Sequence, residues 1–270
     1  MIRTVTATEY VTPLREGGSL PAIVGADDDG TYVVKFRGAG QGVRALAAEL
    51  IAGEIARTLG LPVPEIVLVQ LDGRMARTEP DAEIQELLQK SEGVNVGLDY
   101  LPGAIAFDPL VDRALRGKER LASSIVWFDA LVTNVDRTPK NTNLLVWHRD
   151  LWMIDHGATL IFHHNWTDDV VKRSRKPFPQ IKEHVLLRWA SAIREVDAEL
   201  AATLTAPLLD RILEMVPEDW LDEPRFTSAK EHRAAYRDVL LHQDPCFQQF
   251  MRDTRGETVP QEQRKCASAQ

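Results

Sequence analysis

The sequence has few cysteines and no long apolar run. Its 270 residues include two cysteines, Cys246 and Cys266, which lie far apart in the polar C-terminal region. This pattern suits free thiols in a reducing compartment rather than a disulfide framework. No apolar stretch approaches the roughly 20 residues that span a bilayer, and the N-terminus lacks the basic and apolar segments of a secretory signal. We therefore expect a soluble, cytoplasmic protein that does not bind a membrane.

Several functional classes are disfavoured because their motifs are missing. There is no Gly-x-Ser-x-Gly elbow of a hydrolase and no phosphate loop ending in Gly-Lys-Ser/Thr. The formal net charge of -8 argues against sequence-independent binding of nucleic acid, which needs clustered cations. The sequence has one dense run of cationic residues. A solvated loop and a docking surface are equally good interpretations of this run. Its members are Lys172, Arg173, Arg175 and Lys176.

The first hundred residues predict a small, mainly β unit with one long helix. Residues 21–24 and 31–36 flank a polar turn and predict a hairpin. Apolar residues recur at helical spacing over residues 42–59, and Gly60 follows as a stop signal. Further strands are expected at residues 66–69 and 94–100.

The remainder of the chain predicts mainly helices. The break at residues 101–103 could connect two lobes. Helices are expected at residues 119–132, 185–201 and 207–215, and two short β-like runs at residues 143–147 and 151–154. We therefore predict an α+β, two-lobed fold, with a small β-rich lobe that carries one long helix and a mainly helical second lobe. Its parts are an N-lobe at residues 1–101, a C-lobe at residues 102–250 and a flexible tail at residues 251–270.

Three polar residues of the expected C-lobe have the spacing that phosphoryl transfer uses. Asn141 follows Asp136 by five positions, and Asp155 follows Asn141 by fourteen, at the end of a predicted strand. In protein kinases the first Asp accepts the proton of the attacking hydroxyl, while the Asn and the second Asp hold magnesium. The alternative is that all three are turn residues, since Asp and Asn favour turns.

The expected N-lobe supplies candidates for nucleotide contacts. Lys35, on a predicted strand, could reach the α and β phosphates of ATP, although a lone lysine on a strand is more often a solvated edge residue. The loop of Gly17, Gly18 and Ser19 could cover the phosphates with its N–H groups, although it could also be an ordinary turn. Leu101, at the connection, could contact adenine through its main chain.

The catalytic stretch resembles the HipA family of bacterial serine/threonine kinases. Asp136-x-x-x-Lys140-Asn141 is similar to the HipA catalytic loop, and Ile154-Asp155-His156-Gly157 is similar to the metal-binding turn of the related phosphoinositide kinases. The resemblance runs from about residue 17 to about residue 190. It implies a two-lobed, protein-kinase-like fold. It also implies that Asp136 and Lys140 are catalytic, with Lys140 neutralising charge, and that Asn141 and Asp155 bind magnesium.

A second match lies in the expected N-lobe, where Glu49 precedes Gly60-Leu61-Pro62 as in HipA-like proteins. The resemblance implies that Glu49 positions Lys35, whereas the apolar stripe of the helix favours Glu54. We prefer Glu49 on the family match and keep Glu54 as the alternative. It also makes Ser19 a candidate for autophosphorylation. The chain departs from the family at Thr138, where HipA-type loops usually carry a histidine. It is also shorter than full-length HipA proteins, as are the compact stand-alone members.

These observations lead us to expect a kinase that uses ATP and Mg²⁺ and phosphorylates serine or threonine of a protein. The family resemblance adds the possibility of an antitoxin-like regulator. Two alternatives remain open. One is a kinase for small molecules or lipids, because the fold does not determine the acceptor. The other is a catalytically silent kinase-like module that acts as a regulatory binding partner.

Overall fold

The N-terminal part of the chain is a small β-barrel. The computed structural model describes residues 2–14, 20–111, 115–175 and 178–243. Five strands close in the order β1-β2-β3-β5-β4, with β1 pairing parallel to β4 and the other neighbours antiparallel. The strands are β1 (Arg3–Pro13), β2 (Ala22–Ala26), β3 (Thr31–Lys35), β4 (Ile66–Leu71) and β5 (Gly93–Asp99).

The barrel interior is filled by apolar side chains that alternate along its strands. In β2 and β3 every second residue faces inward, including Val24 and Val34, as expected when successive side chains point to opposite faces. Helix α2 (Ala82–Lys90) and the 3₁₀ helix η1 (Gly73–Thr78) cover one end, where Leu88 is buried in the same core. The predicted hairpin and the predicted strands at residues 66–69 and 94–100 are confirmed.

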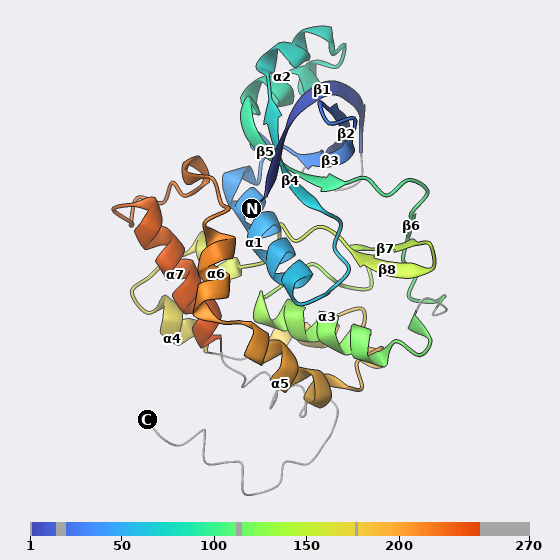
Figure 1. Ribbon diagram of the computed structural model, residues 1–270, viewed down its shortest axis with the longest axis vertical. Coiled ribbons are helices and arrows are strands. Elements are labelled where there is room, and N and C mark those ends of the chain that lie inside the picture. The colour runs from blue at the N-terminus through green and yellow to red at the C-terminus, as the bar shows by residue number, and fades with distance from the viewer. Residues whose placement is uncertain (1, 15–19, 112–114, 176–177, 244–270) are drawn as a thin grey trace, which may run out of the picture.

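Helix α1 (Gly42–Thr58) joins the barrel to the rest of the molecule. It packs against β4 and β5 and also against α6 and η6, so it runs from the barrel into the helical part (Figure 1). This double packing buries most of its residues. The helix ends at the predicted place, where Gly60 has a φ of 74° and its N–H donates to the Arg57 carbonyl.

The C-terminal part is mainly helical, which confirms the α+β character of the fold (Figure 1). A three-stranded sheet lies between the barrel and the helices, in the order β6-β7-β8. Its strands are β6 (Ile105–Ala106), β7 (Leu144–Trp147) and β8 (Asp150–Met153). The α-helices are α3 (Glu119–Leu131), α4 (Val170–Ser174), α5 (Ile193–Thr203), α6 (Ala206–Leu213) and α7 (Ala229–His242). The 3₁₀ helices are η3 (Ile161–His164), η4 (Pro179–Glu183), η5 (Leu187–Trp189) and η6 (Glu218–Trp220).

One predicted element is wrong. The continuous helix expected at residues 185–201 is interrupted after η5, and α5 begins only at Ile193. Ala190 has a non-helical ψ of 62°, and the N–H of Ala192 donates to the hydroxyl of Ser123 on α3 at 2.9 Å. This tertiary hydrogen bond competes with the helical hydrogen bonds and separates the two segments.

Some predictions concern residues outside the described ranges. They are the glycine loop of Gly17, Gly18 and Ser19, the cysteines Cys246 and Cys266, and the tail at residues 251–270. None of the helices in the described ranges has the length and hydropathy required to cross a membrane.

Candidate functional site

Lys35 at the end of β3 lies between two carboxylates. Its Nζ is 2.5 Å from Oε2 of Glu49 and 2.6 Å from Oδ1 of Asp155, and Lys35 is only 8% exposed. Burial alone would lower the pKa of Lys35, but the two carboxylates raise it above its ordinary value. Glu54 instead pairs with Arg57 at 3.1 Å. The structure therefore brings Lys35 against Glu49 rather than Glu54, and the ammonium stays charged.

Glu49 also contacts the predicted metal-binding turn. The main-chain N–H of His156 donates to Glu49 Oε2 at 2.8 Å, and His156 Nδ1 lies 3.3 Å from Glu49 Oε1. Glu49 is completely buried. Burial would raise its pKa, but Lys35 and His156 lower the pKa of Glu49 to about 2. This carboxylate therefore joins α1, β3 and the turn after β8 while staying ionised.

Asp155 combines an unusual backbone conformation with a partly exposed side chain. Its φ of 56° lies in the left-handed region, a conformation that is uncommon for non-glycine residues and is found at functional sites. Its side chain is 40% exposed, although Oδ1 accepts from Lys35. A Cβ added at Gly157 would lie 3.5 Å from Lys35 Nζ and 3.6 Å from Asp155 Oδ1. The glycine thus leaves the space beside these two charged groups open.

The predicted catalytic residue Asp136 is oriented by two asparagines. Its Oδ2 accepts from Asn141 Nδ2 at 2.8 Å and from Asn143 Nδ2 at 3.2 Å. Its own main-chain N–H donates to Asn134 Oδ1 at 3.0 Å. Asn143 was not among the predicted site residues. Its place in the same polar loop as Asp136 and Asn141 was a signal.

The catalytic loop and the metal-binding turn are joined by main-chain contacts. The N–H of Ile154 donates to the carbonyl of Asn143 at 3.1 Å, so the ends of the β7–β8 hairpin lie side by side. Nη1 of Arg137 donates to the carbonyls of both Asn143 and Ile154. Asn143 contacts Asp136, and Ile154 precedes Asp155. The structure thereby brings Asp136, Asn141 and Asp155 to one region.

Lys140 and Leu101 are the remaining predicted site residues within the described ranges. Lys140 is exposed beside Asn141. Leu101 is buried in the connection after β5, and its carbonyl accepts from the N–H of Ala104 at 3.1 Å. Leu20, which follows the predicted phosphate loop, lines a cavity of about 250 Å³.

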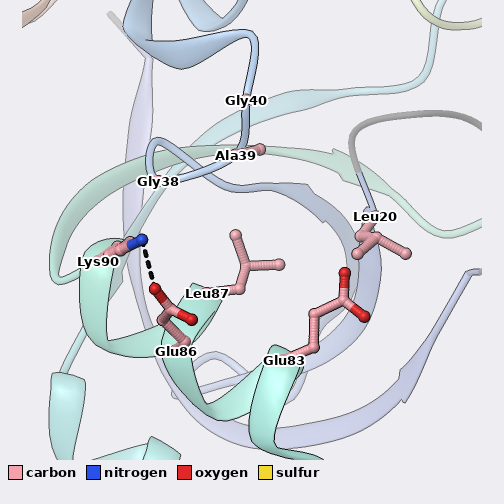
Figure 2. Close-up of a pocket in the computed structure, with 8 residues that line it drawn as sticks. All are labelled: Leu20, Gly38, Ala39, Gly40, Glu83, Glu86, Leu87 and Lys90. Carbon is pink, nitrogen blue, oxygen red and sulfur yellow. Dashed lines mark ion pairs between the residues drawn. The ribbon is translucent and has the colours of Figure 1, made fainter.

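Figure 2 shows this cavity between α2 and the segment after β3. Leu20 faces Leu87 across it, and Gly38, Ala39 and Gly40 form the opposite wall. Glu86 pairs with Lys90 at its rim at 2.5 Å. Lys35 and Asp155 do not line it, so this cavity is separate from the charged site.

The residues present fit a metal-bound nucleotide triphosphate. Asn141 uses its Nδ2 for Asp136, which leaves its amide oxygen available, and Asp155 has a second carboxylate oxygen beyond the one that contacts Lys35. These are the hard oxygen ligands that Mg²⁺ prefers. The charged Nζ of Lys35 and the open space beside Gly157 suit phosphate oxygens. The arrangement can therefore neutralise phosphate charge next to a carboxylate base.

The family model described as HipA-like kinase matches residues 7–247. The chain belongs to this family. As a HipA-like kinase it is a phosphotransferase, and the expected relationship is confirmed. The match extends well beyond the catalytic motifs and includes the C-terminal helices, which the sequence resemblance had not covered.

Among solved structures, this HipA-like kinase is similar to the proinflammatory kinase CtkA of Helicobacter pylori. The TM-score is 0.57 at 11% identity, and the alignment covers 96% of this chain and 100% of that chain. A Golgi casein kinase solved with Mn/ADP is also similar, with a TM-score of 0.46 at 13% identity, covering 92% of this chain and 74% of that one. No curated protein sequence matches the chain. The likeness to CtkA supports the fold.

Proposed function

We propose that this HipA-like kinase transfers the γ-phosphoryl group of ATP, with Mg²⁺, to a serine or threonine hydroxyl of a protein. The proposal depends on one observation, the contact of Lys35 with both Glu49 and Asp155. Kinases place these three groups together around a metal-bound triphosphate. We further propose that residues 1–101 and 102–250 are the two lobes and that the active site lies between them. A cytoplasmic location is part of this proposal, since ATP is abundant there.

Lys35 would bind the α and β phosphates, and Glu49 would hold it in place. The short contacts of Glu49 with Lys35 and with His156 support this role, because they restrict the lysine to one orientation. The loop of Gly17, Gly18 and Ser19 would cover the phosphates, and the main chain at Leu101 would contact adenine.

Asn141 and Asp155 would hold the metal through their free oxygens. When bound, Mg²⁺ neutralises negative charge on the phosphates and thereby favours attack by an oxygen nucleophile. Lys140, exposed on the catalytic loop, would neutralise charge on the transferring group.

Asp136 would take the proton of the acceptor hydroxyl while that oxygen bonds to the γ-phosphorus and ADP leaves. Its hydrogen bonds from Asn141 and Asn143 support this role. Both donors bind the same oxygen, Oδ2, so Oδ1 remains available to the hydroxyl. This orientation supplies the geometry that general-base catalysis requires.

The test compares the parent with Asp136→Asn, by incubation with ATP and Mg²⁺ and mass spectrometry of protein acceptors and of the kinase itself. We expect turnover to fall by ~10²–10⁴, the usual size of a general-base contribution, with little change in nucleotide affinity. Asp150→Asn, which alters an exposed carboxylate paired with Lys118, is the control and should retain activity. Equal phosphorylation by Asp136→Asn and the parent would remove Asp136 from this role. Transfer only to small molecules would refute the protein acceptor.

A further inference from the structure

A buried charged cluster lies directly behind the catalytic loop. At its centre is Asp129, in the last turn of α3 and completely buried. Oδ2 of Asp129 accepts from Arg137 Nε at 2.6 Å and contacts His184 Nε2 at 2.7 Å. Oδ1 accepts from Asn134 Nδ2 at 2.8 Å. We refer to Asp129, Asn134, Arg137 and His184 as the Asp129 cluster.

Asp129 stays ionised and so provides Arg137 with a constant negative partner. Burial would raise the pKa of Asp129, but Arg137 and His184 hold it well below its ordinary value. Nδ1 of His184 accepts from the N–H of Leu186 at 3.0 Å, so the ring proton lies on Nε2 and is donated to Asp129. Burial lowers the pKa of His184, so the imidazole ring stays neutral. Arg137 therefore has a fixed anionic partner.

A second nitrogen of the Arg137 guanidinium, Nη1, contacts main-chain carbonyls next to the proposed site residues. Its Nη1 donates to the carbonyl of Asn143, whose side chain contacts Asp136, and to the carbonyl of Ile154 at 3.4 Å, one residue before Asp155. Its own carbonyl accepts from the N–H of Val185 at 3.1 Å. One rigid planar group thus connects the catalytic loop, the metal-binding turn and the segment that carries His184.

We propose that Arg137, held by Asp129 and His184, is a positioning residue that sets the location of Asp136 relative to Asp155. It does not touch the substrate, and it acts through the two carbonyl groups that it holds. The proposal rests on the proposed function, because it assigns Asp136 and Asp155 to the phosphoryl-transfer site. Lysine cannot replace this arginine, because an ammonium lacks the planar fork that spans Asp129 and both carbonyls.

Arg137→Lys tests this role, with Arg233→Lys as the matched control. Arg233 also donates to two main-chain carbonyls, those of Leu213 and Val216 at 3.0 and 2.7 Å, but it belongs to α7, away from the site. We expect Arg137→Lys to lower kcat about 100-fold, the size of effect that a misplacement of about 1 Å can produce. KM for ATP should change less than about threefold. Arg233→Lys should leave kcat unchanged.

Two substitutions at His184 distinguish a role in positioning the catalytic loop from a role in stabilising the fold alone. Gln places an amide nitrogen near the position of Nε2 and can donate to Asp129, whereas Asn places its polar atoms near Nδ1, which bonds to Leu186. If His184 acts through Asp129, His184→Gln should retain at least tenfold more kcat than His184→Asn. Comparable melting temperatures for the two variants establish that folding is not the cause.

The outcomes distinguish this inference from the proposed function. If the parent is active and Asp136→Asn is not, but Arg137→Lys matches the parent, the positioning role is refuted and the proposed function stands. A parent without phosphotransfer would refute the proposed function itself. If Arg137→Lys does not fold, the order of the His184 variants decides: higher kcat for Gln supports the inference, and equal kcat refutes it.

Discussion

Glu49 and His156 are joined through both carboxylate oxygens of the glutamate. One oxygen accepts the main-chain N–H of His156 at 2.8 Å, and the other lies 3.3 Å from its ring Nδ1. Glu49 belongs to α1, whereas His156 follows the last strand of the C-terminal sheet. The same carboxylate holds Lys35. The helix that enters from the barrel is therefore attached directly to the turn that carries Asp155.

The ionised state of Glu49 predicts how stability depends on pH. Its folded pKa of about 2 lies below the ordinary value of 4.5, so its contribution is complete above about pH 4.5 and is lost as the pH falls toward 2. The acid limb is the part of the curve in which the free energy of unfolding falls as the pH is lowered. We expect Glu49→Gln to make this fall less steep between about pH 4.5 and pH 2. Urea denaturation at a series of pH values measures this change.

The control for this experiment is Glu54→Gln, on the same helix. Glu54 pairs with Arg57 and does not contact Lys35. It provides the reference for a carboxylate change on α1 that leaves the Lys35–Glu49 contact intact. Asp129, whose pKa is also lowered, will still contribute to acid unfolding in the Glu49→Gln variant. An unchanged acid limb in Glu49→Gln would show that folding does not lower the pKa of this carboxylate.

Lys35→Met is expected to weaken nucleotide binding. Methionine fills a similar volume without the charge that would attract phosphates, and it leaves Glu49 and Asp155 without their shared cation. We expect kcat/KM for ATP to fall about 10²–10³-fold, as when one preorganised charge-stabilising group is removed. The thermal shift caused by ATP and Mg²⁺ should also shrink. Lys90→Met, at an exposed lysine paired with Glu86, should retain both properties.

The sequence predicted most strands and helices that have simple periodicity, but it gave no bounds for the long helix α7. It predicted neither β1 nor α2, because β1 carries mainly exposed polar residues on its outer face and α2 is short. The helix predicted at residues 185–201 is interrupted by a hydrogen bond to Ser123, a contact between distant segments. Local patterns identify elements, but they do not show where tertiary hydrogen bonds interrupt them.

The same limit applies to the site. The order and spacing of Lys35, Asp136 and Asp155 were visible in the sequence, whereas only the family resemblance favoured Glu49 over Glu54. The apolar stripe was misleading because α1 is buried on most of its faces, including at Glu49. Contacts such as His184 with Asp129 join residues 55 positions apart. Only the folded chain reveals these buried polar pairs.

We predict that Asn143→Asp disturbs the proposed base, Asp136, without straining the backbone. Asn143 has a φ of 48°, and Asp, like Asn, tolerates this left-handed conformation. The change replaces an N–H donor to Asp136 at 3.2 Å with a second carboxylate. Loss of the hydrogen bond and repulsion between like charges should reduce kcat about tenfold. Steady-state kinetics should show this fall without a matching rise in KM for ATP, and a parental kcat would contradict the orienting role of Asn143.

Gly157→Ala is predicted to separate stability from activity. The added Cβ would make ordinary contacts, 3.5 Å from Lys35 Nζ and 3.7 Å from Ala45 Cβ, so the fold has room for it. The free energy of unfolding should stay the same or rise by about 0.4–1 kcal/mol, as for Gly→Ala changes at compatible positions. In the proposed function, the methyl group occupies space needed beside the phosphates and the metal, so KM for ATP should rise about tenfold or more.

The control for this change is Gly40→Ala, where an added Cβ would have no neighbour within 4 Å. Its added methyl group would have no atom of Lys35 or Asp155 within 4 Å, so KM for ATP should stay unchanged. Chemical denaturation and ATP titration of both variants provide the two measurements. A parental KM for ATP in Gly157→Ala would place the phosphates elsewhere, because a methyl group next to both Lys35 Nζ and Asp155 Oδ1 could not leave their contacts with a bound triphosphate unaffected.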